Sequence, residues 1–101
     1  LVIHAHPFRE ESYIPAVRLF PGLIHAVEVW NMGNIGRSPL FNQRAVDWAK
    51  KMSLPATGGS DAHHVNDPHG GMLFEQKPKD LADFIAQVKT GQGWEVITQP
   101  I

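Results

Sequence analysis

The sequence has no cysteine and no long apolar run. Without Cys, a disulfide framework and thiolate zinc sites are both excluded. The apolar runs are a few residues long, far short of the roughly 20 residues that a membrane-spanning helix needs, and no signal peptide is visible. We therefore expect a cytoplasmic protein that does not enter the membrane.

An excess of charge of one sign is also lacking. The 101 residues carry 9 Lys and Arg against 10 Asp and Glu, which gives a formal net charge of −1. Proteins that hold long duplex DNA usually show a basic excess, so composition disfavours that class, although a small phosphate site would leave the balance unchanged. With 43% hydrophobic residues, the chain has the size and composition of one globular domain.

The chain also lacks a starting methionine. It opens on Leu1 and enters an apolar stretch at once. We expect it to be part of a longer protein whose upstream portion is missing here.

Strand and helix patterns alternate along the sequence. Apolar stretches predict strands at residues 1–5, 24–30, 55–59, 72–75 and 94–98, and periodic patterns predict helices at about 42–52 and at 78–90. Asn42 is the expected N-cap of the first helix, and Gly91 suits the end of the second. The second helix carries an apolar stripe that we expect in the core, made of Leu81, Phe84, Ile85 and Val88. The alternation indicates an α/β fold with a mostly parallel sheet.

Polar side chains follow three of these strands. His6 follows the first, Glu28 to Asn31 close the second, and Asp61 and His63 follow the third. The carboxyl ends of parallel strands share one edge of a sheet, where reactive residues of such folds lie. The sequence therefore predicts that these groups converge.

The stretch Asp61-Ala62-His63 has the spacing of a pair of metal ligands. Residues two apart in an extended segment point the same way, and carboxylate and neutral imidazole suit Zn, Mn and Fe. Gly58 and Gly59 would let the backbone approach closely. An exposed polar loop is the competing interpretation, but convergence with His6 favours a metal site. His6, Asp61 and His63 are our candidate ligands.

Most of the remaining polar candidates have competing interpretations. His4 lies one step inside the strand, where a hydrogen-bonded core histidine is the commoner outcome. Glu28 is a ligand, an orienting residue or a base, or else a solvated carboxylate. Arg9 either holds a substrate phosphate or is ordinary surface charge. His64 flanks the pair, and His69 lines the site mouth or belongs to a loop.

Together, AHPFR at 5–9, VEVWN at 27–31 and GGSDAH at 58–63 resemble the second half of the PHP (polymerase and histidinol phosphatase) metal-dependent phosphoesterases. The resemblance implies a distorted (β/α)7 TIM-like barrel, of which residues 1–101 would form the C-terminal part. It also implies two or three divalent metal ions in the intact domain, Mn, Zn or Fe. By motif position it makes His6, Asp61 and His63 metal ligands.

The resemblance places the family's other ligands, including another H-x-H near the start of the whole domain, upstream of Leu1. We therefore expect the 101-residue fragment alone to be inactive and the parent protein to be a hydrolase. Its substrate would be a phosphate ester of a nucleotide, an oligonucleotide end or a small metabolite.

Two alternatives to this function remain. An amidohydrolase-like metal hydrolase would need His4 as a true ligand. A non-catalytic binding or scaffold module would keep a PHP-like fold without the reaction. Exposed sheet edges also predict a homo-oligomer.

Overall fold

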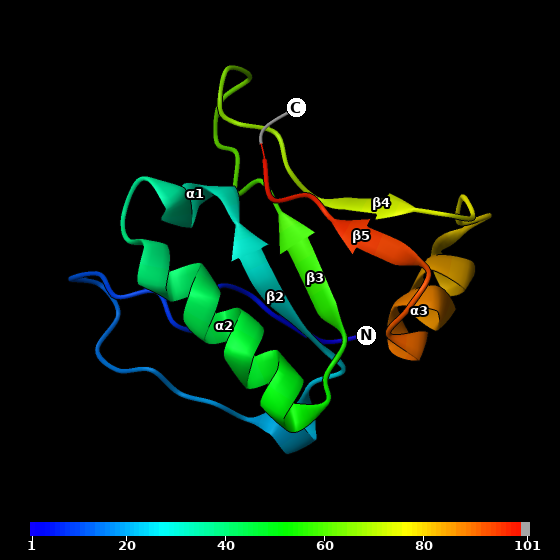
Figure 1. The fold of residues 1–101 in the computed structure, drawn as a ribbon, viewed down its shortest axis with the longest axis horizontal. Helices are drawn as coiled ribbons and strands as arrows, with labels where there is room; N and C mark the ends of the chain where they lie inside the picture. Colours follow the sequence, from blue (N-terminus) through cyan, green and yellow to red (C-terminus); the bar gives the residue numbers. More distant parts are fainter. Residues whose placement is uncertain (100–101) are drawn as a thin grey trace.

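A parallel sheet of three strands forms the centre of the molecule in the computed structural model, which describes residues 1–99 (Figure 1). Its order is β1 (Ile3–His4), β2 (Ala26–Asn31) and β3 (Ala56–Gly59). The register of β2 against β3 slips by one residue between Glu28 and Trp30. Such irregularities re-aim side chains at strand ends, and this one lies beside the polar end of β2.

Two helices, α1 (Met32–Ile35) and α2 (Pro39–Met52), connect β2 to β3. The N-cap predicted at Asn42 was wrong. The helix begins earlier because Ser38 is extended and its hydroxyl accepts the N–H of Leu40 at 3.2 Å, while Pro39 supplies a preset φ in the first turn. Asn42 lies inside the helix and is 4% exposed.

The core lies between α2 and β2. Val27 and Val29 of the strand form one buried cluster with Ala45 and Ala49 of the helix. The two alanines face the sheet one turn apart, which allows the helix to lie close to the strand. This packing fixes the carboxyl end of β2 relative to the start of α2.

A second unit follows β3. It consists of β4 (Met72–Phe74), α3 (Leu81–Thr90) and β5 (Trp94–Val96). The two strands pair antiparallel, with Phe74 opposite Trp94, so the prediction of a mostly parallel sheet was wrong for this half. Gly91 and Gly93 both have positive φ, which reverses the chain after α3 and returns it alongside β4.

The predicted second helix is present, with Gly91 in the left-handed conformation at its end. It begins after Asp80, whose side chain accepts the N–H of Asp83. Val88 is fully buried and Phe84 packs against Phe74 at 5.8 Å between ring centroids. The prediction of Leu81 in the core was wrong: the residue is 72% exposed because it is the first residue of α3.

Between β1 and β2 the chain is irregular apart from the 3₁₀ turn η1 (Pro21–Leu23). Within residues 1–99 the strands form two separate sheets and do not close into a barrel. None of the helices in this range has the length and hydropathy to cross a membrane.

Candidate functional site

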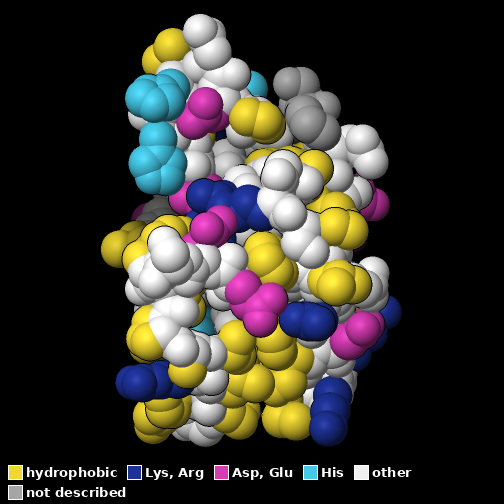
Figure 2. Space-filling model, turned by 90° about the vertical axis from the view of Figure 1, so that its left-hand side faces the viewer, with side chains coloured by type: hydrophobic (Ala, Val, Ile, Leu, Met, Phe, Trp, Pro, Cys, Tyr) yellow, Lys and Arg dark blue, Asp and Glu magenta, His cyan; other side chains and the backbone are white. Residues whose placement is uncertain are grey.

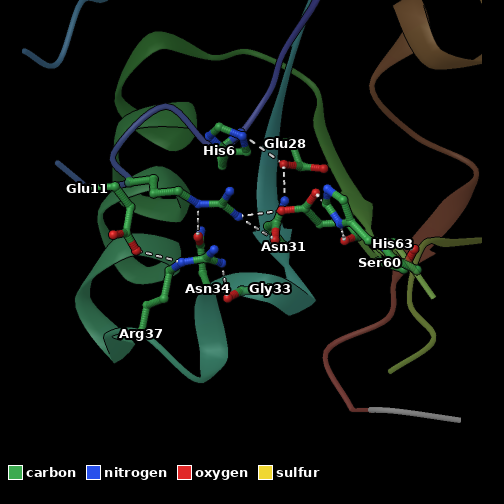
Figure 3. Close-up of polar contacts among 12 residues, drawn as sticks. His6, Glu11, Glu28, Asn31, Gly33, Asn34, Arg37, Ser60 and His63 are labelled. Carbon is green, nitrogen blue, oxygen red and sulfur yellow. Dashed lines mark hydrogen bonds and ion pairs between the residues drawn. The ribbon is translucent and has the colours of Figure 1, made fainter. Parts of the chain in front are cut away.

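The ends of the three parallel strands meet around one ion pair. The Nη2 atom of Arg9, from the turn after β1, lies 2.6 Å from Oδ2 of Asp61, from the loop after β3. The backbone N–H of His6 donates to Oε1 of Glu28 on β2 at 2.9 Å (Figure 3). The predicted convergence of these chain segments is therefore present in the structure.

Arg9 lies inside the molecule, with 5% of its surface exposed. Its Nε donates to Asn34 Oδ1 at 2.8 Å, and its Nη2 donates to Asn31 Oδ1 at 3.0 Å as well as to Asp61. Burial alone would lower the pKa of Arg9, but the hydrogen bonds and charges of Asp61 and Tyr13 raise it above its usual value. Arg9 thus stays charged and has most of its donors occupied by the protein.

Asn42 anchors this arrangement from α2. Its Oδ1 accepts the backbone N–H of Asn31 and the amide of Asn34, and its Nδ2 donates to the carbonyl of Asn31. Asn31, Asn34 and Asn42 are at most 4% exposed. We call Arg9 with these three asparagines the asparagine–arginine network. Buried polar groups are costly unless paired, and here each amide has partners.

Asp61 is held at the edge of the asparagine–arginine network. Its partial burial would raise the pKa of its carboxyl, but the hydrogen bond and charge of Arg9, with smaller effects of His6 and His63, lower that pKa below its usual value. The residue has a φ of 54° and His6 has a φ of 27°. Strain of about 1–3 kcal/mol per residue at both positions fits a backbone that its surroundings hold in place.

Glu28 orients the turn that carries His6. Its Oε1 accepts both the His6 N–H and the amide of Asn31, each at 2.9 Å. Its Oε2 lies only 2.6 Å from the place that a Cβ on Gly59 would take. A Cβ on Gly58 would approach the side chain of Val96 to 2.7 Å and the carbonyl of Gly71 to 2.8 Å. The glycine pair therefore lets β3 pass close to Glu28 and to the second sheet.

The loop after β3 holds its histidines loosely. The side chain of His63 is 76% exposed, and its Nδ1 lies 3.9 Å from Asp61 Oδ1 and 2.8 Å from the Asp61 carbonyl oxygen. Asp67 Oδ2 accepts the backbone N–H groups of His63 and His64. His64 and His69 are exposed. This loop projects at the top of Figure 1, and histidine side chains gather at the same end in Figure 2.

His4 is half-buried at the end of β1 and lies outside the buried core cluster. Its ring lies edge-on to Trp48 with centroids 6.4 Å apart, and its Nδ1 is buried without a hydrogen-bond partner within residues 1–99. Burial, and then the nearby His6, lower its pKa. The contact with Trp48 favours a structural role for this ring.

The metal site implied by the sequence is not assembled by these residues. Across the described part of the chain, no three His, Asp or Glu side chains lie close enough together to hold a metal ion. Asp61 and His63 line one cavity of about 260 Å³, while His6 lines another of about 270 Å³. The Arg9 guanidinium pairs with Asp61, so a metal bound here would need further ligands from outside the described residues.

Residues 39–67 match the family model described as PHP-associated. The chain contains a PHP-related region. The matched segment runs through α2 and β3 into the following loop, so it includes Asp61 and His63 but not His6. No curated protein and no solved structure matches the chain. The PHP-related region thus covers the anchor at Asn42 and the carboxylate that Arg9 holds.

The sequence patterns predict Arg9 and the Asn31 end of β2 near the site, but not Asn34 or Asn42, whose amides complete the asparagine–arginine network. The signal available was the recurrence of Asn at 31, 34 and 42 around a short loop that follows a buried strand.

Proposed function

We propose that the chain is the C-terminal part of a PHP-type phosphoesterase domain with a TIM-like barrel, and that the parent protein hydrolyses phosphate esters. Two observations support this. The PHP-associated match covers the segment with Asp61 and His63, and the ends of three parallel strands bring Arg9, Glu28 and Asp61 together. That strand-end convergence carries the proposal, because reactive groups of such folds lie at this edge.

In this proposal the chain supplies one wall of the site. Arg9 keeps Asp61 ionised and oriented, and Glu28 fixes the turn that carries His6. A divalent metal would supply charge stabilisation for an attacking water and the phosphate. Since the described residues gather no three-donor set, the remaining ligands must come from outside them, and we propose that residues 1–101 alone are inactive.

The test compares two proteins in one assay. Residues 1–101 and the protein as its gene encodes it, with any residues before Leu1, are purified and given phosphomonoesters of nucleotides and small metabolites with Mn²⁺ or Zn²⁺. We expect metal-dependent turnover from the encoded protein, its loss in Asp61→Asn, and none from residues 1–101. Turnover by residues 1–101 that persists in Asp61→Asn would overturn the proposal.

A non-catalytic PHP-like module is the second candidate, and the Arg9–Asp61 pair favours it. A guanidinium at 2.6 Å from Oδ2 supplies the positive charge that a metal would otherwise bring. Metal analysis separates the two candidates: an encoded protein that retains no divalent metal and hydrolyses no ester is the module. The amidohydrolase-like alternative loses support, because it needs His4, which packs on Trp48.

A further inference from the structure

A second cavity is lined by Arg9, whereas the cavity that His63 lines includes the partner of Arg9, Asp61. The second cavity has a volume of about 270 Å³ and is formed by the turn after β1 and the irregular segment before η1. His4 lines it from the end of β1, His6 and Arg9 from the turn that follows, and Ile14, Arg18 and Phe20 from the irregular segment. Its volume is near the lower end of the range for small-molecule sites.

The ionisable side chains of this cavity are all basic. Two arginines and two histidines line it, and no carboxylate does. Arg9 is largely occupied by Asp61 and the two asparagines. Arg18 is exposed and makes no ion pair or side-chain hydrogen bond to any residue in the 1–99 range. It is therefore the cation that is available to a ligand, and its forked donors suit a phosphate.

An aromatic ring lines the same cavity. Phe20 is 50% exposed although it is large and apolar. Its neighbour in the lining, Ile14, is half-buried and extends the apolar side. A half-exposed ring in the same lining as Arg18 offers stacking to a planar group and charge to an anion in one place. The two together fit a nucleotide better than a simple anion.

We propose that this cavity binds a nucleoside monophosphate, with the phosphate on Arg18 and the base on Phe20. Binding of the nucleotide is argued from the cavity alone, whereas its identity as the substrate rests on the proposed function. His6 lies in the same lining, so the bound phosphate ester would be placed beside the edge where the strand ends converge.

Calorimetric titration of the encoded protein, in buffer freed of metals by a chelating resin, tests whether the cavity binds a nucleoside monophosphate. The probes are AMP, adenosine and inorganic phosphate. We expect AMP to bind more tightly than either of the other two, because only AMP engages both Arg18 and Phe20. Arg18→Gln should weaken AMP and phosphate binding about tenfold, and Phe20→Ala should weaken AMP binding about tenfold and leave phosphate binding unchanged.

Matched controls use exposed residues outside the cavity. Arg44→Gln removes a half-exposed arginine from α2, and Leu23→Ala removes an exposed apolar side chain from η1; both should leave affinities unchanged. The proposal is overturned if AMP does not bind, if Arg18→Gln and Arg44→Gln act alike, or if Phe20→Ala leaves AMP affinity unchanged. Because no metal or turnover is involved, AMP binding without hydrolysis by the encoded protein would count against the proposed function and not against this inference.

Discussion

Two regions at the same edge of the sheet hold their polar groups in opposite ways. The asparagine–arginine network is buried, and its donors and acceptors are paired across β2, α1 and α2. The loop after β3 leaves His63 three-quarters exposed and held through backbone groups to Asp67. The comparison shows that an ion pair with Arg9 fixes the carboxylate of Asp61, whereas the imidazole of His63 lies mostly in solvent.

Removing Arg9 should destabilise the protein more than any other substitution proposed in either region. Arg9→Leu leaves Asp61, Asn31 and Asn34 without their shared donor, and losing one partner of a largely buried ion pair costs about 3 kcal/mol or more. We expect that loss in the free energy of unfolding measured with urea. His63→Ala, in the exposed loop, should change it by less than about 0.5 kcal/mol.

A surface arginine provides the matched control for charge. Arg44 lies 4.0 Å from Glu10 and is half-exposed, so Arg44→Leu should cost at most about 0.5 kcal/mol. If Arg9→Leu and Arg44→Leu proved equally mild, the asparagine–arginine network would not be the rigid part of the site.

Removing the anchor on α2 should have the next largest effect. Asn42→Ala deletes the acceptor shared by Asn31 and Asn34 and leaves both buried donors unpaired, at a cost of about 2 kcal/mol. Urea unfolding measures this cost, and Gln43→Ala, one residue on and exposed, is the control. Equal stability of the two variants would show that water replaces the Asn42 contacts.

Gly59 lies at the end of β3, between the two regions, and a substitution there tests how firmly Glu28 is held. Gly59→Ala places a Cβ 2.6 Å from Glu28 Oε2, and Glu28 is tied to His6 and Asn31, so the overlap should cost about 1–3 kcal/mol. Gly22→Ala is the control, because nothing lies within 4 Å of a Cβ there. Thermal unfolding of both variants compares them, and a Gly59→Ala protein as stable as Gly22→Ala would mean that Glu28 moves freely.

The sequence patterns predict where the parallel strands end, but they do not predict which side chains contact one another there. Convergence of His6, Glu28 and Asp61 follows from parallel strands, which alternating patterns reveal. The burial of Arg9 could not be read from sequence, because it depends on acceptors from Asn31, Asn34 and Asp61 that fold geometry brings together. The antiparallel pairing of β4 with β5 was missed because a helix between two strands usually signals a parallel crossover.

Acid titration compares the two regions through one carboxylate from each, Asp61 from the edge of the network and Asp67 from the loop. The folded-state pKa of Asp61 lies below its ordinary value of 3.8, despite partial burial, because of Arg9. That of Asp67 is lowered mainly by the N–H groups of His63 and His64. A lowered folded pKa adds stability above the unfolded pKa, and that stability is lost as the pH falls through the folded value.

Urea unfolding between about pH 7 and pH 2.5 should therefore show the wild type losing its advantage over Asp61→Asn as acid is added, with the two curves meeting below the folded pKa. Asp67→Asn should follow the wild type more closely, since water screens the exposed loop. This is the smallest expected effect, because the experiment measures only the pH-dependent part of the stability that the Arg9–Asp61 ion pair contributes. Curves for Asp61→Asn and Asp67→Asn that coincide would mean that Arg9 fixes Asp61 no more firmly than backbone N–H groups fix Asp67.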